Sequence, residues 1–218
     1  MADMQWNAET RYKMLLEINN AVVTRTNRED LFQALAKELR KHVAFDRMAI
    51  NLYDAQSNSI SYFAAADGVQ PGGVMTRHSR PLADGAIARM VVQSRQPTII
   101  DDLRRYKDLS SIGAMVEAGL TATMAFPMLV RNRILGSIHF SFRDSPEHIS
   151  ELTQVLTDVS RQVAIAVDNM LAYTGLEKVN RSLEREKAFL LQSSEEYPRD
   201  EFFHASASMA EIMRTIEQ

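Results

Sequence analysis

The chain has 218 residues, of which 45% are hydrophobic, so it is long enough for one substantial domain with a buried core. Its net charge of −3, with basic residues spread along the chain, argues against direct binding of nucleic acid. The absence of cysteine excludes disulfides, thiolate nucleophiles and thioether-linked chromophores, and the absence of a leader or a long apolar run predicts a cytoplasmic protein without membrane contact.

Two amphipathic helices are predicted at the start of the chain. From Thr10 to Val23, apolar residues recur at spacings of three and four, which predicts a helix with one apolar stripe. The sequence Thr26-Asn27-Arg28-Glu29 resembles a capping box, in which the side chains of Thr26 and Glu29 satisfy free backbone amides. A second helix is expected to follow, with apolar positions at Leu31, Phe32, Leu35, Ala36 and Leu39.

The pattern then changes to the two-residue period of β-strands. Residues 48–53 alternate between apolar and more polar side chains, which predicts a strand with two unlike faces. Residues 55–59 are expected to form a turn, and residues 60–66 a second strand that completes a hairpin. Residues 67–73 are predicted as a loop, followed by a short strand at 75–80.

The middle of the chain is predicted to hold one helix and one short strand. Asp84 is the expected N-cap of a helix that ends before Pro97, because the residue before a proline avoids the helical conformation. Residues 98–100 are expected to form a short buried strand. The weak pattern of residues 101–119 is interpreted as a helix-containing lid or an excursion from the sheet.

Two strands and one very long helix close the predicted fold. The strands are 121–130 and 134–142, joined by a turn at 131–133. From Pro146 to about Ser193 the apolar residues follow a heptad pattern that changes phase after Gly175. A helix of this length needs a partner for its apolar stripe, and the candidates are the first helix and a second copy of the chain, so we expect a homodimer. The positions assigned to the dimer interface are Leu152, Leu156, Val159, Val163, Met170, Leu176 and Leu183.

Together these elements predict an α/β (α+β) sandwich. A central antiparallel sheet of five or six strands is expected to carry the N-terminal helices and the long C-terminal helix on one face. The other face is expected to hold a ligand pocket. The residues assigned to ligand binding are Asn51, Tyr53, Phe63, His78, Arg80, Thr123, Ser137 and His139.

His139 is the candidate of most interest, because it lies in an otherwise apolar strand. It is interpreted either as a ligand contact or as a histidine satisfied on an open sheet. His78 and Arg80 can supply positive charge to an anionic ligand, and without one they are solvated. No metal site is predicted, since the histidines lack metal-binding spacings and adjacent carboxylates in a strand, as at Asp101 and Asp102, point in opposite directions.

The order of these elements resembles the GAF family over about Met14 to Ala172. The resemblance is carried by residues 81–88, 93–101, 124–128 and 134–138, with Ala88 in place of a second family glycine. It implies a sensory domain that binds a small molecule. An enzyme of the free methionine sulfoxide reductase type, which shares the fold, is not expected, because that chemistry uses cysteines and the chain has none.

The end of the chain carries a second resemblance. Residues 201–212 are similar to the start of the AAA+ domain of sigma-54-dependent activators, with His204 and Ala207 in place of a glycine and a proline. No phosphate-binding Gly-x-x-x-x-Gly-Lys-Ser/Thr motif occurs. The predicted domains are an N-terminal extension at 1–9, a GAF sensory domain at 10–172, a helical coiled-coil linker at 173–197 and the start of a truncated output domain at 198–218.

These observations predict a regulatory sensor domain of a signalling or transcriptional regulatory protein. Ligand binding is expected to alter the packing of the long helices and so control the chain's own C-terminal output domain. The alternative is a ligand-free structural dimerisation module of a histidine kinase or a cyclic-di-GMP signalling protein. No cofactor is expected, and the candidate ligand is a small anionic metabolite.

Overall fold

The computed structural model describes residues 8–23, 25, 27–64, 66–71 and 79–195. The chain divides into two compact units, Met1–Ala172 and Tyr173–Gln218, which are described separately below. In chain order the elements are α1 (Ala8–Val23), α2 (Arg28–Leu39), β1 (Arg47–Asp54), β2 (Ser59–Tyr62), β3 (Asp67–Gly68), β4 (Arg80–Pro81), the 3-10 turn η1 (Leu82–Asp84), α3 (Ala86–Ser94), β5 (Thr98–Ile100), the 3-10 turn η2 (Leu103–Tyr106), α4 (Ser110–Glu117), β6 (Ala122–Val130), β7 (Arg133–Phe142) and α5 (Ile149–Glu195).

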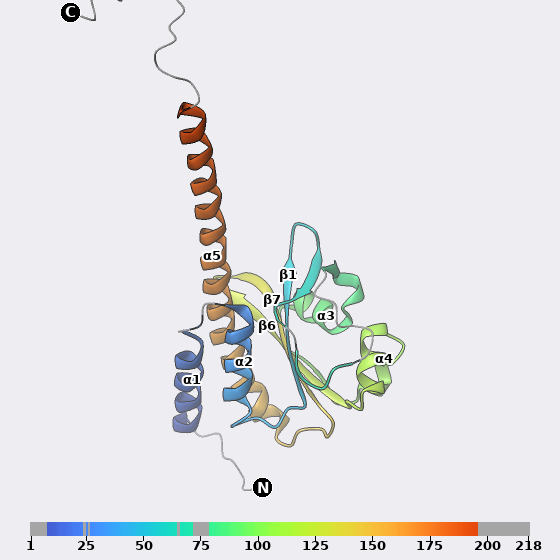
Figure 1. Cartoon of the computed structure of the whole chain (residues 1–218). Coiled ribbons are helices and arrows are strands. Elements are labelled where there is room, and N and C mark those ends of the chain that lie inside the picture. The colour runs from blue at the N-terminus through green and yellow to red at the C-terminus, as the bar shows by residue number, and fades with distance from the viewer. Residues whose placement is uncertain (1–7, 24, 26, 65, 72–78, 196–218) are drawn as a thin grey trace, which may run out of the picture. The chain divides into compact units, whose positions relative to one another are not determined.

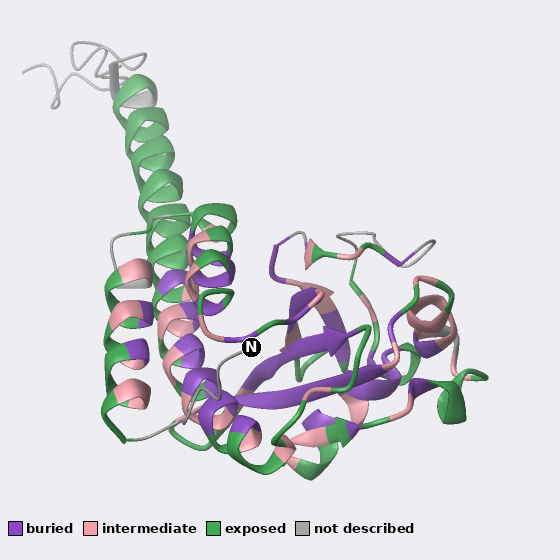
Figure 2. Ribbon diagram, turned by 90° about the horizontal axis from the view of Figure 1, so that it is seen from below, coloured by how far each residue is buried: buried purple, intermediate pink, exposed green. Residues whose placement is uncertain are grey.

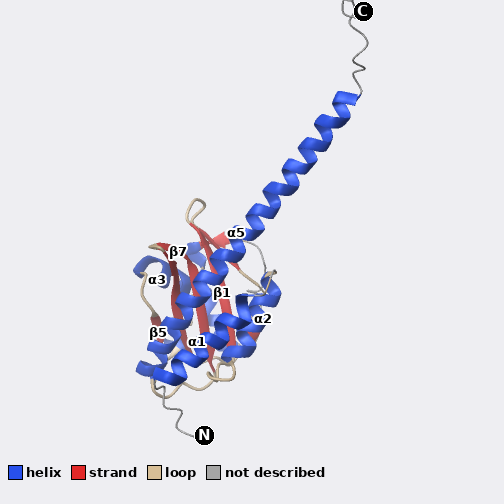
Figure 3. Cartoon of the chain, turned by 90° about the vertical axis from the view of Figure 1, so that its left-hand side faces the viewer, coloured by secondary structure: helices blue, strands red, loops and turns tan. Residues whose placement is uncertain are grey.

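The first unit is built on one antiparallel sheet, which confirms the predicted fold class. Its strands follow the order β4-β2-β1-β7-β6-β5, and the two-residue β3 pairs with β1 beside this path. The central pair is β1 with β7, in a register that places Arg47 opposite Ser141 and Asn51 opposite Ser137. Helices α1 and α2 and the first part of α5 lie on one side of the sheet, and α3 and α4 lie on the other (Figures 1 and 3).

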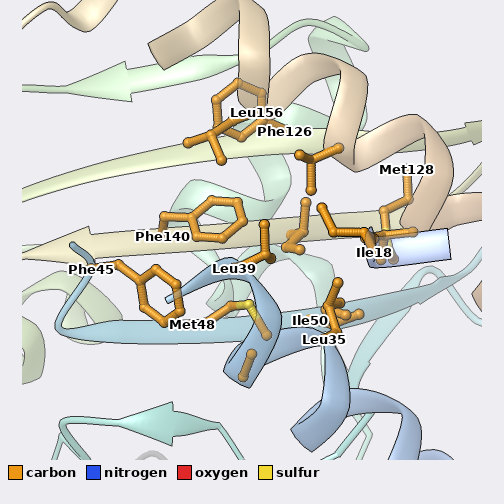
Figure 4. Close-up of a cluster of buried hydrophobic side chains, with 14 of the residues drawn as sticks. Ile18, Leu35, Leu39, Phe45, Met48, Ile50, Phe126, Met128, Phe140 and Leu156 are labelled. Carbon is orange, nitrogen blue, oxygen red and sulfur yellow. The ribbon is translucent and has the colours of Figure 1, made fainter. Parts of the chain in front are cut away.

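The main hydrophobic core lies between the sheet and α1, α2 and α5 (Figure 4). The apolar positions of β1 and β7 point into it, as their two-residue period predicts. The Phe140 ring packs edge-on against Phe45 at 5.6 Å and against Phe126 at 6.2 Å between ring centroids. Strands β6 and β7 are buried over nearly their whole length (Figure 2), so close packing holds the sheet rigidly from its helix-covered side.

Several local predictions were wrong by a few residues. The structure caps α2 with Asn27, whose side chain accepts a hydrogen bond from the backbone N–H of Asp30 at 2.8 Å, and Thr26 of the predicted capping box lies outside the described residues. Asp84 does not cap α3 but ends the turn η1, and α3 begins after Gly85 without any side-chain cap. The reason is that Gly85 adopts a conformation that interrupts the helix between the two segments.

The predicted strand lengths also need correction at the sheet edges. Strand β2 ends at Tyr62 rather than continuing to Ala66. The side chain of Ile99 in β5 is 41% exposed, since β5 is an edge strand, so the strand is not fully buried as expected. Of the strand predicted at 75–80, residues 75–78 lie outside the described residues, and β4 occupies Arg80–Pro81.

The long helix α5 uses its apolar residues in two different ways. Leu152, Leu156, Val159, Val163 and Met170 are at most 7% exposed and form part of the core described above. These five side chains are therefore covered within their own domain and are not available to a second copy, which corrects their assignment to the dimer interface. In the second unit, Leu176 and Leu183 are 70% and 57% exposed.

Among the described residues, no helix combines the length and the apolar character that crossing a bilayer requires.

Candidate ligand-binding site

A cavity of about 50 Å³ lies on the side of the sheet that α3 and α4 cover. Its floor is formed by Arg47, Ala49 and Asn51 of β1 and by His139 and Ser141 of β7. These residues share one face because they occupy alternate positions of two paired strands. Their neighbours in sequence fill the hydrophobic core on the opposite face. Residues from the α3 and α4 regions form the cavity wall, namely Gly85, Ile87, Ala88, Ser111 and Met115.

Three of the predicted ligand-binding residues meet in this cavity. Asn51, Arg80 and His139 all line it, although Arg80 comes from the short edge strand β4. The alternation of polar and apolar residues along β1 and β7 was sufficient to place Asn51 and His139 on the same face. The assignment of these residues to ligand binding stays a prediction, and it now refers to one defined cavity.

Four other predicted residues do not line the cavity. Phe63 follows the end of β2 and is buried in the helix-side core, where the Arg28 guanidinium lies over its ring at 5.6 Å. Tyr53 donates a hydrogen bond from its hydroxyl to Asn58 Oδ1 at 3.1 Å within the β1–β2 hairpin. Thr123 and Ser137 are fully buried.

These two buried hydroxyls support the cavity floor instead of facing a ligand. The Thr123 hydroxyl donates to the carbonyl of Phe140 at 3.1 Å, and the Ser137 hydroxyl lies 2.7 Å from His139 Nε2. The remaining predicted residue, His78, lies outside the described residues.

Asn51, which lines the cavity, carries an unsatisfied buried acceptor. Its side chain is 6% exposed, and its Oδ1 atom is buried and accepts no hydrogen bond from any residue that the structure describes. A buried acceptor without a donor costs free energy, so such atoms are rare and usually have a function. Asn51 lies in the middle of the sheet, between Tyr62 of β2 and Ser137 of β7, so its backbone is held from both sides.

Gly136 allows the close approach of β7 to β1 beside Asn51. Its φ is +148°, and a Cβ atom at this position would lie 1.9 Å from the backbone oxygen of Asn51. Residues other than glycine would push the two strands apart.

Arg47 is the residue that the sequence interpretation missed. Its side chain lies at the cavity although the residue is only 5% exposed, and its Nη1 donates to the backbone oxygen of Val69 at 2.7 Å. Burial lowers the pKa of the guanidinium, which still remains charged at neutral pH. Arg47 precedes Ala49 and Asn51 at the same two-residue spacing, a signal that could have identified it.

The cavity has a positive electrostatic character. Arg47 and Arg80 both line it, while none of its described lining residues carries a carboxylate. The first turn of α3 adds to this character, because its amides have no side-chain cap and Gly85, Ile87 and Ala88 line the cavity. Free amides at a helix N-terminus favour negative charge.

His139 is held neutral in this environment. Burial is the main cause that lowers the pKa of its imidazole to about 3, and the nearby charges of Arg47 and Arg80 contribute to this shift in the same direction. A neutral imidazole beside the Ser137 hydroxyl offers polarity without adding a third positive charge to the cavity. The site is therefore suited to binding and orienting an anion.

A second group of polar side chains links α1 to the end of α2. Ligand atoms of Glu17, Glu38 and His42 lie within 4.8 Å of one another. Lys41 Nζ lies 2.6 Å from Glu38 Oε1, and His42 Nε2 lies 3.2 Å from Glu17 Oε2. The His42–Glu17 contact joins the segment after α2 to α1, and the Lys41–Glu38 ion pair lies at the end of α2 itself.

Comparison with known proteins begins with a protein-family model. The model described as "GAF domain" matches residues 25–168. Among curated proteins, the chain is similar to the formate hydrogenlyase transcriptional activator FhlA of Escherichia coli, with 22% identity over 219 residues that cover 94% of this chain and 30% of that protein. It is also similar to the DNA-binding transcriptional activator HyfR of Escherichia coli, with 22% identity over 80% of this chain and 26% of that protein. The chain thus spans about a third or less of the length of these relatives.

Solved structures show a similar fold. The GAF domain of an Acinetobacter phosphoenolpyruvate-protein phosphotransferase superposes with a TM-score of 0.60 at 14% identity, covering 76% of this chain and 98% of that one. The free methionine-R-sulfoxide reductase of Neisseria meningitidis, in complex with its substrate, superposes with a TM-score of 0.58 at 12% identity, covering 74% of this chain and 90% of that one. At such low identity these likenesses concern the fold alone.

Proposed function

Since the chain belongs to the GAF domain family, we propose that it is a regulatory sensor domain that binds a small anion and has no enzymatic activity. The observation that carries this proposal is the cavity on the α3 side of the sheet. Arg47, Arg80 and the N-terminus of α3 line it, and its described lining residues include no carboxylate. This positive character attracts a small anion from solution.

The size of the cavity narrows the ligand class. Its volume of about 50 Å³ is a third of the roughly 150 Å³ that accommodates benzene in a protein interior. A molecule with a few non-hydrogen atoms, such as a short carboxylate, therefore fits without rearrangement. Cyclic nucleotides, bilins and haem are far larger, so we propose a small monocarboxylate.

Calorimetric titration of the purified chain tests this proposal. Formate, acetate and phosphate are the probes, and we expect at least one carboxylate to bind and to raise the Tm. The Arg80→Gln variant should bind that carboxylate roughly tenfold more weakly, because it removes one of the cavity's positive charges.

The matched control is Arg89→Gln, which makes the same change of charge on α3 at a residue that does not line the cavity. It should leave the affinity unchanged. If no carboxylate binds at millimolar concentration, the sensor proposal fails and the ligand-free structural module becomes the better account. Equal losses in both arginine variants would also contradict the proposed site.

We further propose that two copies of the chain pair along the second unit. There, apolar side chains recur on a continuous helix and are exposed to solvent, at 70% for Leu176, 57% for Val179 and 57% for Leu183. A helix with an exposed apolar stripe is stabilised by a matching stripe on a second copy. Such pairing would give the sensor a symmetric output.

Sedimentation equilibrium tests the pairing. The wild-type chain should be a dimer at micromolar concentration, and the Leu176→Glu, Leu183→Glu double variant a monomer, because the added carboxylates repel each other across the seam. The control variant Ser182→Glu adds a charge beside this stripe and should remain dimeric. A monomeric wild-type chain at high micromolar concentration would refute the pairing.

The relatives suggest what the domain controls. The similar curated proteins are transcriptional activators, and residues 201–212 resemble the start of a sigma-54-type AAA+ domain. We therefore propose that ligand binding in the cytoplasm regulates an output module of that type. In a reporter assay of the complete activator that contains this domain, Arg80→Gln should alter the response to the bound carboxylate more than Arg89→Gln.

A further inference from the structure

The unsatisfied oxygen of Asn51 indicates a second requirement of the ligand. Two arginines and the first turn of α3, which no side chain caps, give the cavity hydrogen-bond donors that favour an anion. Asn51 Oδ1 is different, because it is an acceptor and has no donor among the described residues. A bare carboxylate, which only accepts hydrogen bonds, would leave this atom unsatisfied.

Building on the proposed anion site, we propose that the ligand is a small hydroxycarboxylate, whose carboxylate meets the arginines and whose hydroxyl donates a hydrogen bond to Asn51 Oδ1. The Asn51 side chain is 6% exposed and lines the cavity beside Arg47, so an acceptor and a cation share one confined space. A molecule that carries a carboxylate and a hydroxyl on neighbouring carbons matches both groups within about 50 Å³.

The charge of the cavity selects a hydroxyl over an ammonium group as the donor. Arg47 and Arg80 lower the pKa of His139 in the same cavity, so their field disfavours any additional positive charge there. An amino acid would place its ammonium group in that field. A neutral hydroxyl donates to Asn51 Oδ1 without this penalty.

The surroundings of Asn51 keep the acceptor in place. Asn51 pairs with Tyr62 and Ser137 on the two sides of β1, and the approach at Gly136 leaves no space for its backbone to shift toward β7. A ligand without a donor cannot be accommodated by moving the acceptor away. The site should therefore discriminate strongly against a carboxylate that lacks the hydroxyl.

The decisive experiment compares three probes of similar size by calorimetric titration of the full chain. Glycolate carries the hydroxyl, acetate lacks it, and glycine replaces it with an ammonium group. We expect glycolate to bind at least roughly tenfold more tightly than acetate, the ratio expected for one hydrogen bond to a buried acceptor, and glycine to bind no more tightly than acetate.

Variants at residue 51 show whether Asn51 causes the preference. Asn51→Leu keeps most of the side-chain volume but removes the acceptor, so the ratio of glycolate to acetate affinity should fall to about one while acetate binding changes little. Asn51→Ala is the second variant, in case leucine prevents folding. The control Gln93→Leu removes an amide from the exposed surface of α3 and should keep the wild-type ratio.

Each outcome decides the proposal. Equal affinity of the wild-type chain for glycolate and acetate would overturn the hydroxycarboxylate inference but leave the anion site intact, and would indicate that a water molecule satisfies Asn51. A preference for glycolate that persists in both Asn51 variants would also overturn it. If neither acid binds, the anion site itself is wrong and the inference falls with it.

Discussion

The two faces of the central sheet are made by the same strands but have opposite properties. In β7, Phe140 points into the helix-covered core and is fully buried among other rings, whereas its neighbour His139 points into a polar cavity. In β1, Ile50 likewise lies in the core and its neighbour Asn51 lines the cavity. The helix-covered face is filled by packed apolar side chains, whereas the cavity face carries polar groups, among them an oxygen of Asn51 that has no donor among the described residues. The comparison separates the residues that maintain the fold from those that are free to recognise a molecule.

The largest expected effect is on the packed face. Phe140→Ala removes a fully buried ring that contacts Phe45 and Phe126, and it should lower the free energy of unfolding by about 3–5 kcal/mol. Chemical denaturation followed by circular dichroism measures this loss. The control Ile99→Ala, at a side chain that is 41% exposed, should cost about 1 kcal/mol or less. Similar losses in the two variants would show that this face is not the main core.

The expected effect on the cavity face is a dependence of the free energy of unfolding on pH. The pKa of His139 is lowered from 6.5 to about 3 in the folded chain. Below pH 6.5 His139 binds a proton in the unfolded chain but not in the folded chain, so the free energy of unfolding falls as the pH drops toward 3. This one group should cost about 2 kcal/mol between pH 7 and pH 5.

The measurement is urea denaturation of the wild-type chain and of His139→Gln at both pH values. The variant cannot take up that proton, so its loss of stability over this interval should be smaller by about the same 2 kcal/mol. If the two proteins lose stability in parallel, the imidazole is not buried in a neutral form. The difference between the proteins isolates His139 from the other histidines.

The smallest effect has the opposite sign. Asn51→Leu removes a buried oxygen that has no donor among the described residues, and it should raise the free energy of unfolding by up to about 1 kcal/mol in the absence of ligand. Thermal denaturation without added acids measures this gain. A clear destabilisation would mean that the Asn51 amide contributes to the fold, and the contrast between the two faces would be weaker than described.

Much of this arrangement could be predicted from residue alternation. The two-residue period of β1 and β7 placed Asn51 and His139 on one face, because strand geometry leaves no other choice once the core side is known. The same period places Phe63 in the core, because Tyr62 lines the cavity opposite Asn51 and the next residue faces the other way, with the Phe63 amide donating to the carbonyl of Ile50 at 2.9 Å. The assignment of Phe63 to the ligand therefore did not follow the alternation of its own strand.

The long helix shows a second limit of pattern analysis. A heptad spacing predicts an apolar stripe but does not identify what covers it. Leu156 is covered by its own domain, whereas Leu183 in the second unit is exposed, although both were assigned to the dimer interface. The positive cavity was also only partly foreseen, because Arg47 comes at the start of β1 and precedes the alternating run from which the strand was predicted.

The approach of β7 to β1 at Gly136 has a consequence for tracing how such domains diversify. Because a side chain at this position would collide with the backbone of the facing strand, we expect selection to remove substitutions at 136 whatever molecule the domain recognises. The residue types at positions 51 and 139, by contrast, can change when the ligand changes. Among related domains, we therefore expect the glycine at position 136 to be invariant, and the residues at positions 51 and 139 to vary with the ligand that each domain binds.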